Sequence, residues 1–138
     1  MMSKKAKYAI NAMVHLARKH GQGPITIGDI AQDENIPQKF LEAILLELKN
    51  AGLLSSKKGK GGGYYMIKET SEVNMADIMR LMDGPIALLP CVSYKHYERC
   101  EECKDEHTCS IRKVFFEVRN TSVEMLKDAT LDRVIENR

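Results

Sequence analysis

All four cysteines of this 138-residue chain lie in one short polar segment, residues 91–109. The segment reads CVSYKHYERCEECKDEHTC, and its many charged residues make it a poor core and a poor helix. Cysteine is usually buried as a small hydrophobic residue, so four thiols gathered in a polar segment need a reason other than packing. The chemistry open to them is metal binding, redox chemistry or a disulfide.

Composition narrows these three options. With 43% hydrophobic and 29% charged residues, the chain fits one globular domain with a modest core. Residues 2–10 are basic and then apolar for too short a run to be a signal peptide, and no apolar run approaches the roughly 18 residues of a membrane span. We therefore expect a cytoplasmic protein with no membrane partner. Thiols stay reduced in that compartment, which favours a metal or redox role over structural disulfides.

The spacing of the thiols fits more than one metal. The candidate ligands are Cys91, Cys100, Cys103 and Cys109, with His96 and His107 as fallback ligands from the same loop. Iron–sulfur clusters commonly take four cysteines. Four thiolates also make a closed tetrahedral zinc site, although only the central CxxC pair has the close spacing of a zinc knuckle. The spacing alone does not decide between an iron–sulfur cluster and zinc.

A CxxC pair is also found in thiol oxidoreductases, which gives an alternative from another functional class. In this chain the two residues between Cys100 and Cys103 are glutamates, and acidic neighbours disfavour the thiolate that such an enzyme needs. The thioredoxin-like alternation of strands and helices is also absent around them, and the sequence contains no phosphate loop, nucleophile elbow or carboxylate dyad. We therefore expect no enzyme.

The cysteine loop must be positioned by the helices and strands that precede it in the sequence, and the first two of these are predicted to be amphipathic helices. Residues 4–20 place apolar side chains at helical spacing and are followed by Gly21, a common helix stop. A shorter helix follows Thr26, and Asp29 stands three residues later as a partner resembling a capping box.

A third helix is predicted over about residues 38–51, where Phe40, Leu41, Ile44, Leu45 and Leu48 form a wide apolar stripe. Pro37 suits its first turn, where a missing N–H costs nothing, and the link from the second helix is short. A short helix, a tight turn and a longer helix form a helix-turn-helix.

Two strand-like segments follow, residues 53–58 and 64–69, joined by the sequence GKGGG. Glycines let the tip approach another backbone closely and lysines give it positive charge, as a DNA-contacting wing requires. Lys and Arg outnumber Asp and Glu by 10 to 5 in residues 1–66, whereas acidic residues lead by 14 to 11 in residues 67–138. The alternative to DNA binding is that the three helices and the hairpin form a packing module, in which GKGGG is only a flexible turn.

These elements resemble the BadM/Rrf family of winged helix-turn-helix transcriptional regulators. The blocks FLEAILLELKNAGLL and KGGGY carry the resemblance, which continues through NMADIMRLMDGPIALLPC to a closing ATLDRV. It implies a mainly α fold with a small β-hairpin wing and a long C-terminal dimerisation helix. The implied divisions are a winged helix-turn-helix DNA-binding domain (1–83), a cysteine-bearing sensor loop (84–110), and a dimerisation helix with a C-terminal segment (111–138).

The resemblance implies that the start of the third helix enters the major groove of double-stranded DNA. The candidate DNA-binding residues are Gln38, Lys39 and Glu42 on this helix and Lys57, Lys58 and Lys60 at the wing. Ala43 replaces a glutamine common in the family and cannot bond a base bidentately, which predicts a different operator. Lys58 stands where members often carry an arginine, and lysine fits a narrow minor groove less well.

The segment at residues 110–129 reads as a helix of about five turns. Its apolar residues along one side are Ile111, Val114, Phe115, Val118, Met125 and Leu126. The resemblance implies that this helix crosses its counterpart in a homodimer that reads a pseudo-palindromic operator. The alternative is that it folds back on its own domain.

The resemblance also implies that the cysteine loop is a sensor of iron–sulfur cluster, redox or nitric oxide status. Cluster-binding members of the family present three cysteines separated by five residues each. Cys103 and Cys109 keep that spacing, Cys91 lies eleven intervening residues before Cys103, and Cys100 is additional. The loop therefore resembles a lengthened form of the family's sensor loop.

The non-cysteine ligands used in the family are missing here. One branch has a histidine where Arg112 stands, and another has an N-terminal aspartate at or next to Lys7. Neither side chain can replace them as a metal ligand. Four cysteines would complete a 2Fe–2S or 4Fe–4S cluster unaided. The alternative is the same DNA-binding regulator with a structural zinc or a cofactor-free thiol loop.

Overall fold

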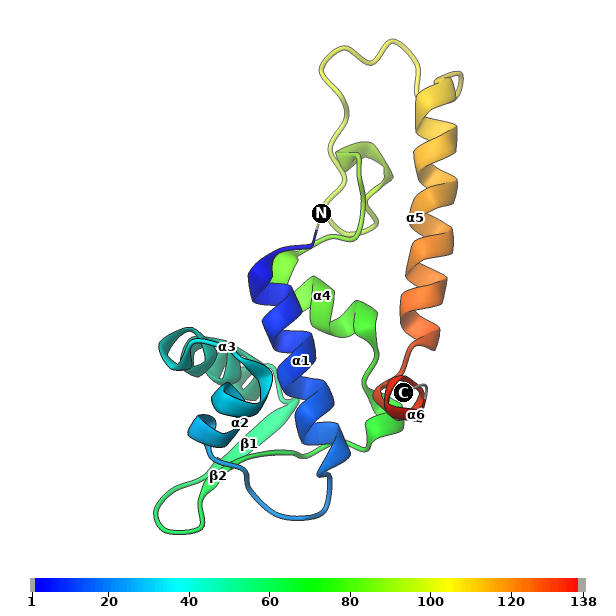
Figure 1. The fold of residues 1–138 in the computed structure, drawn as a ribbon. Helices are drawn as coiled ribbons and strands as arrows, with labels where there is room; N and C mark the ends of the chain where they lie inside the picture. Colours follow the sequence, from blue (N-terminus) through cyan, green and yellow to red (C-terminus); the bar gives the residue numbers. More distant parts are fainter. Residues whose placement is uncertain (1, 137–138) are drawn as a thin grey trace.

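The computed structural model describes residues 2–136, which form a mainly helical fold with one two-stranded hairpin (Figure 1). The elements are α1 (Lys4–Arg18), α2 (Ile27–Glu34), α3 (Gln38–Asn50), β1 (Leu54–Lys57), β2 (Gly63–Met66), the 3₁₀ turn η1 (Thr70–Glu72), α4 (Met75–Asp83), the 3₁₀ turn η2 (Pro90–Val92), α5 (Ser110–Asp128) and α6 (Leu131–Glu136). The predicted fold class is confirmed.

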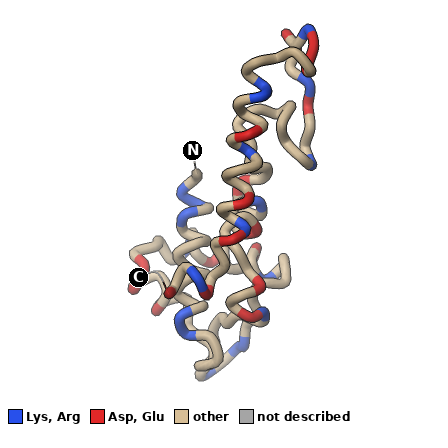
Figure 2. The backbone as a smooth tube through the Cα atoms, turned by 90° about the vertical axis from the view of Figure 1, so that its right-hand side faces the viewer, with Lys and Arg blue, Asp and Glu red and all other residues tan. Residues whose placement is uncertain are grey.

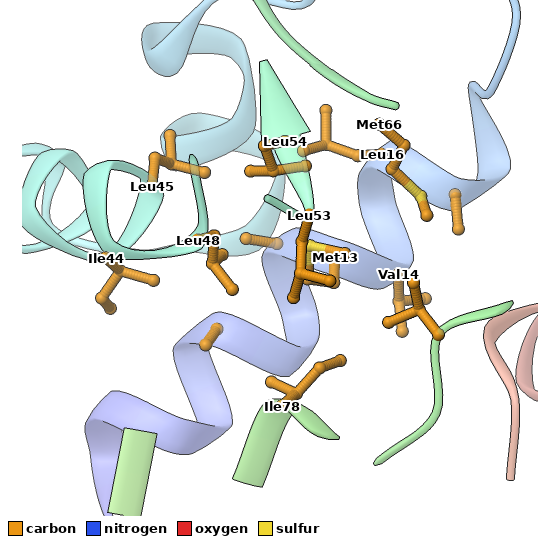
Figure 3. Packing of buried hydrophobic residues seen from close by; sticks show 14 of the residues in the cluster. Met13, Val14, Leu16, Ile44, Leu45, Leu48, Leu53, Leu54, Met66 and Ile78 are labelled. Carbon is orange, nitrogen blue, oxygen red and sulfur yellow. The ribbon is translucent and has the colours of Figure 1, made fainter. Parts of the chain in front are cut away.

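Helix α1 lies at the centre of the hydrophobic core. It contacts α3 on one side and α4 and α6 on others, so its buried face extends around most of the helix. Met13 is fully buried, and Figure 3 shows it beside Leu53, with Leu48 of α3 and Ile78 of α4 close by. Burying a side chain of this size contributes about 1.5–3 kcal/mol, and α1 supplies further buried residues on both sides of Met13.

Helices α2 and α3 form the predicted helix-turn-helix. The Thr26 hydroxyl caps α2 by accepting a hydrogen bond of 3.2 Å from the Asp29 amide. Asn35 ends α2 with a φ of 54°, a left-handed conformation that asparagine tolerates better than most residues. Pro37, predicted in the first turn of α3, is instead its N-cap, one position earlier, because the helix begins at Gln38.

The predicted wing is the antiparallel hairpin β1–β2. Its register pairs Leu54 with Met66 and Lys57 with Gly63, so the regular strands are shorter than predicted. Ile25 extends the hairpin through an antiparallel bridge to Tyr64, with hydrogen bonds of 2.9 and 2.8 Å. The segment before α2 therefore anchors the wing beside the helix-turn-helix.

The wing tip depends on glycine for steric reasons. A Cβ atom added at Gly62 would lie 2.2 Å from the carbonyl oxygen of Lys57, and one at Gly63 would lie 2.3 Å from that of Ile25. The Gly62 amide also donates a 3.0 Å hydrogen bond to the Gly59 carbonyl. The tip is thus a closely folded turn, which fixes the backbone from which its lysines project.

Replacing Gly62 with alanine is expected to destabilise the protein by about 1–3 kcal/mol, because the new methyl group meets backbone atoms that cannot move independently. Chemical denaturation measures the change. Gly28→Ala is the matched control, because a Cβ at this helical position meets no atom within 4 Å and alanine favours a helix. Equal stability of the two variants would contradict a closely folded tip.

The chain returns to the central core after α5. Leu131 of α6 is fully buried, its amide donates to the Val73 carbonyl at 2.9 Å, and the Met75 amide donates to the Ala129 carbonyl at 3.0 Å. Helix α5 rises along one side of the molecule, where its lower part contacts α4 (Figure 1) and buries Val123. None of the helices within residues 2–136 has the length and hydropathy needed to cross a membrane.

Candidate DNA-binding surface and cysteine loop

The first two turns of α3 present an exposed polar face. Gln38, Lys39 and Glu42 are all exposed. The buried side of the same helix consists of Leu41, Ile44, Leu45 and Leu48. No side chain caps the start of α3 and its first turn has no acidic residue, so the amide groups of a helix N-terminus stay available to a phosphate. The predicted recognition residues therefore share the accessible end of one helix.

Contacts on two sides fix the direction of α3. Lys5 of α1 forms a 2.8 Å ion pair with Glu47, and the Lys49 ammonium donates a 2.8 Å hydrogen bond to the Ser56 hydroxyl of β1. The two contacts are partly exposed, so each contributes at most about 1 kcal/mol. Together with the buried leucines they set the orientation of the exposed turn relative to the wing.

The three wing lysines, Lys57, Lys58 and Lys60, are exposed, and no ion pair found within residues 2–136 involves them. Their charges are therefore not neutralised by a protein carboxylate in direct contact. Figure 2 shows basic segments at the lower end of the molecule, where Figure 1 places the hairpin. The hairpin and α3 lie on the side of the molecule away from α5, as a groove-reading helix and a phosphate-contacting wing require (Figure 1).

The cysteine loop lies at the other end of the molecule. It leaves α4, forms the short turn η2, and extends beside the upper end of α5 (Figure 1). Between η2 and α5 the chain has no helix or strand. Its hydrogen bonds include one from the Tyr97 hydroxyl to the Glu106 carboxylate, nine positions away, and one from the Glu98 amide to the Pro90 carbonyl. The loop is therefore connected to the rest of the molecule through η2, α4 and α5.

The two outer cysteines are held at the base of this loop. Cys91 lies in η2 with only 8% of its surface exposed, whereas Cys109 is the N-cap of α5 and its sulfur accepts a 3.4 Å hydrogen bond from the Arg112 amide. The Arg112 guanidinium donates to the Cys91 carbonyl at 3.4 Å. One residue thus contacts both outer cysteines.

The two inner cysteines form a turn in the outer part of the loop. The Cys103 amide donates to the Cys100 carbonyl at 3.1 Å, and the Arg99 guanidinium donates to the Cys103 and Lys104 carbonyls at 3.3 and 3.4 Å. The Cys100 thiol donates a 2.8 Å hydrogen bond to the Glu102 carboxylate, which raises the pKa of Cys100 above its ordinary value. A ligand that needs the Cys100 thiolate must displace this contact.

The structure does not bring the four predicted ligands together. All four thiols are free, and no three metal-ligating side chains within residues 2–136 are grouped to hold a metal ion. His96 and His107 are exposed. The chemistry of the donor set still fits an iron–sulfur cluster or zinc, because both take four cysteine thiolates. The inner pair lies in the segment between η2 and α5 that lacks regular secondary structure.

A stack of cationic and aromatic side chains ties the loop base to α5. The Arg119 guanidinium lies 5.1 Å from the Phe116 ring centroid and 5.9 Å from that of Tyr94, and Arg112 lies 5.7 Å from the same Phe116 centroid. From the sequence, Arg112 stands out only as the residue at a missing ligand position. The spacing of residues 112, 116 and 119 places them on one helix face, which is the signal that could have indicated the stack.

Another face of α5 carries a stripe of exposed apolar residues. Its members are Ile111 (60% exposed), Val114 (57%), Val118 (40%) and Met125 (69%). Three of them recur every seven residues, the spacing of a helix–helix seam. Phe115 and Leu126, predicted on the same side, are half-buried. Exposed apolar residues at this spacing need a covering surface.

The end of α4 is tied to the start of α1. The Ser3 amide donates a 3.0 Å hydrogen bond to the Asp83 carboxylate, and the Ser3 hydroxyl also donates to it. These hydrogen bonds lower the pKa of Asp83. Since Ser3 is also the N-cap of α1, the contact joins the end of α4 to the helix at the centre of the core.

The chain matches known proteins by family, by sequence and by structure. The family model Rrf2, described as iron-dependent transcriptional regulator, matches residues 2–137. An rrf2-like HTH-type transcriptional regulator of Rhodobacter capsulatus is 40% identical over 138 residues, which is 98% of this chain and 92% of the relative. These relatives bear the names of transcriptional regulators, which confirms the expectation of a regulator over an enzyme.

Two solved structures extend the comparison over the whole chain. CymR (YrzC), the global cysteine regulator of Bacillus subtilis, matches with a TM-score of 0.84 at 30% identity, covering 100% of this chain and 98% of that one. IscR from T. potens matches with a TM-score of 0.78 at 25% identity, covering 99% and 87%. The chain therefore shares the arrangement of helices and hairpin found in both proteins.

Proposed function

The chain belongs to the Rrf2 family of transcriptional regulators, and on that premise we propose that it is a cytoplasmic homodimer that binds double-stranded DNA and senses iron–sulfur cluster, redox or nitric oxide status through its cysteine loop. The observation that supports the proposal is that two different kinds of surface lie at opposite ends of the molecule. An exposed helix start and a basic wing occupy one end, and four free thiols occupy the other.

The proposed DNA contacts divide between base reading and phosphate binding. Gln38 and Lys39 are long enough to reach base edges in the major groove, and Glu42 can accept a hydrogen bond from a cytosine amino group. The wing lysines supply charge to the backbone and make binding salt-dependent. Sequence preference should therefore depend on the α3 residues, and overall affinity on the wing.

The proposed homodimer covers the exposed stripe of α5. A symmetric pair of α5 helices would bury Ile111, Val114, Val118 and Met125 against the same residues of the second copy. The matches to the solved structures of CymR and T. potens IscR cover 100% and 99% of this chain, so they include the segment that forms α5. Two copies present two recognition helices, which predicts a pseudo-palindromic operator.

The proposed ligands of the cluster are the four cysteines of the loop. Cys91 and Cys109 are already held at the loop base by Arg112, and Cys100 and Cys103 would join them by movement of the outer loop. When bound, an iron–sulfur cluster supplies a centre that reacts with oxidants or nitric oxide and can be gained or lost. The relative IscR and the description of the family as iron-dependent support this choice over zinc.

The connection to DNA runs through the start of α5. Because Cys109 caps this helix, engaging its sulfur as a ligand fixes where α5 begins. Helix α5 contacts α4, and the end of α4 is bonded to Ser3 of α1. Ordering the loop should thus favour one separation of the two recognition helices, and loosening it should shift the population towards others.

Replacing Cys103 with alanine is expected to reduce cluster loading to background, because only three of the four thiolates that the proposed cluster takes remain. Operator affinity should change by about 5-fold or more relative to the loaded protein, a typical coupling between two sites. Iron and sulfide assays and DNA titration measure both effects. His107→Ala, another change in the exposed loop, should load normally. A Cys103→Ala protein that matched the loaded wild type on every operator would contradict the switch.

DNA recognition itself is tested by selection of binding sites from a pool of random duplexes. We expect enriched sequences with two related half-sites about one helical turn apart, because a symmetric dimer places two α3 helices on one face of the duplex. A Gln38→Ala protein should lose preference at specific base positions while keeping its salt dependence. Recovery of single half-sites or of no common sequence would contradict the proposed dimeric reader.

A further inference from the structure

The turn formed by Cys100 and Cys103 has the geometry of a reversible thiol pair. The hydrogen bond from the Cys103 amide to the Cys100 carbonyl closes a four-residue turn, which brings the two Cα atoms within about 7 Å. A disulfide needs Cα atoms about 4.4–6.8 Å apart, so a small adjustment suffices. We propose that these two thiols form a disulfide when the metal-free protein reacts with a hydroperoxide.

The surroundings of the turn support this pairing. Cys100 is exposed and Cys103 is half-exposed, so a small oxidant reaches both, while Arg99 holds the turn closed through the Cys103 and Lys104 carbonyls. The Cys100 thiol now contacts Glu102 and must rotate away from it to meet the second sulfur. Rotation of an exposed side chain is fast, and the backbone needs only the small adjustment between the two Cα atoms.

The two outer cysteines are poorer partners for this reaction. Cys91 is buried in η2, which keeps oxidant away from it. Cys109 caps α5, and within residues 2–136 no backbone hydrogen bond joins it to the Cys100–Cys103 turn. The inner pair therefore reacts first, and with itself.

The reaction balances with one hydroperoxide per pair. Because the Cys100 thiol donates its proton to a hydrogen bond with Glu102, Cys103 is the first to react. Cys103 loses its proton, its thiolate sulfur attacks a peroxide oxygen, and the O–O bond breaks. The sulfur becomes a sulfenic acid, and the hydroxide that leaves takes up the proton to form one water. The second thiol sulfur then attacks the first, the S–O bond breaks, and the hydroxyl leaves with a proton as a second water. Two thiols are oxidised to one disulfide and the peroxide is reduced to two waters. A dithiol reductant reverses the change.

This inference does not depend on the proposed cluster, but its regulatory consequence does. If the four cysteines are the cluster ligands, a Cys100–Cys103 disulfide removes two of them, so the oxidised protein cannot be loaded. After a cluster has been lost, the oxidised loop could bind a new cluster only once a reductant had restored the two thiols. The disulfide would act as a second redox step at the same loop.

Digestion with trypsin tests the proposed disulfide, because it places the inner pair of cysteines and each outer cysteine in separate peptides. Cleavage after Arg80, Lys95, Arg99, Lys104 and Arg112 places Cys91 in residues 81–95, both inner cysteines in residues 100–104, and Cys109 in residues 105–112. Metal-free, reduced protein is treated with hydrogen peroxide, alkylated and digested. We expect peptide 100–104 to resist alkylation and to be lighter by two hydrogen atoms, while the other two peptides are fully alkylated.

Two variants sharpen the result. Cys109→Ser should still lose two thiols to peroxide, whereas Cys100→Ser should lose the light form of peptide 100–104. Alkylation of all three peptides, or a cross-link from peptide 100–104 to another, would overturn the inference. Because these measurements use metal-free protein, a failure to load iron would leave them unaffected. Unimpaired cluster loading of the oxidised wild type would overturn the regulatory consequence alone.

Discussion

Replacing Lys57, Lys58 and Lys60 together with alanine is expected to weaken operator binding by at least about 100-fold near physiological salt, because a dimer then loses the charge of both wings. These lysines are exposed and make no ion pair within residues 2–136, so their removal costs little folding stability. DNA titration over a range of salt concentrations measures the effect. The slope of log affinity against log salt should become shallower by about 0.9 for each phosphate that the protein no longer neutralises.

The matched control for the wing is a second triple-alanine variant. Lys95, Lys104 and Lys113 are also exposed and give the same change in net charge, but they lie in or next to the cysteine loop. If the wing contacts DNA, this control should change affinity much less than the wing variant. Equal losses in the two variants would mean that net charge alone attracts DNA, and the wing would have no special role.

Replacing Val118 with aspartate is expected to raise the Kd of the dimer by more than about 100-fold, because each copy would place an unpaired carboxylate in the seam formed by α5. Val118 is 40% exposed in one chain, so the single chain should keep its fold. Analytical ultracentrifugation measures the dimer, and circular dichroism checks the fold. Binding to a complete operator should fall with the dimer, while binding to one half-site changes little.

Val118→Ile is the matched control for the seam, because it keeps an apolar β-branched side chain at the same position. It should remain dimeric with normal operator binding. A Val118→Asp protein that stays dimeric at micromolar concentration would show that this stripe is not the interface. The long helix would then have to be covered by its own domain or by another protein.

The fold could be predicted largely from local signals. Thr26 before an apolar-periodic run marked the start of α2, and the GKGGG turn between two short runs marked the hairpin. These signals are local because capping and turn closure involve residues only a few positions apart. The predicted start of α3 at residue 38 agrees with the structure, but Pro37, predicted in the first turn, is the N-cap. Local signals therefore place a helix start only to within about one or two residues.

The cysteine loop was less predictable for a physical reason. Its sequence indicates which atoms are available, but their positions depend on contacts between distant residues. The hydrogen bond between Arg112 and the Cys91 carbonyl spans 21 positions, and the stacking of Arg119 on Tyr94 joins the loop to the middle of α5. Such contacts follow from how α5 packs, which the pattern of the loop itself does not encode. The ligand set and the DNA contacts therefore stay predictions.

Spectroscopy of protein purified without oxygen tests the central claim, that the four-cysteine loop holds an iron–sulfur cluster. Iron, sulfide and zinc are quantified on the same sample. The proposed function predicts broad absorbance around 400 nm from sulfur-to-iron charge transfer, equal amounts of iron and sulfide, and loss of both in Cys103→Ala. A colourless protein that carries zinc or no metal would contradict the claim. It would leave a DNA-binding regulator whose loop is structural or thiol-based.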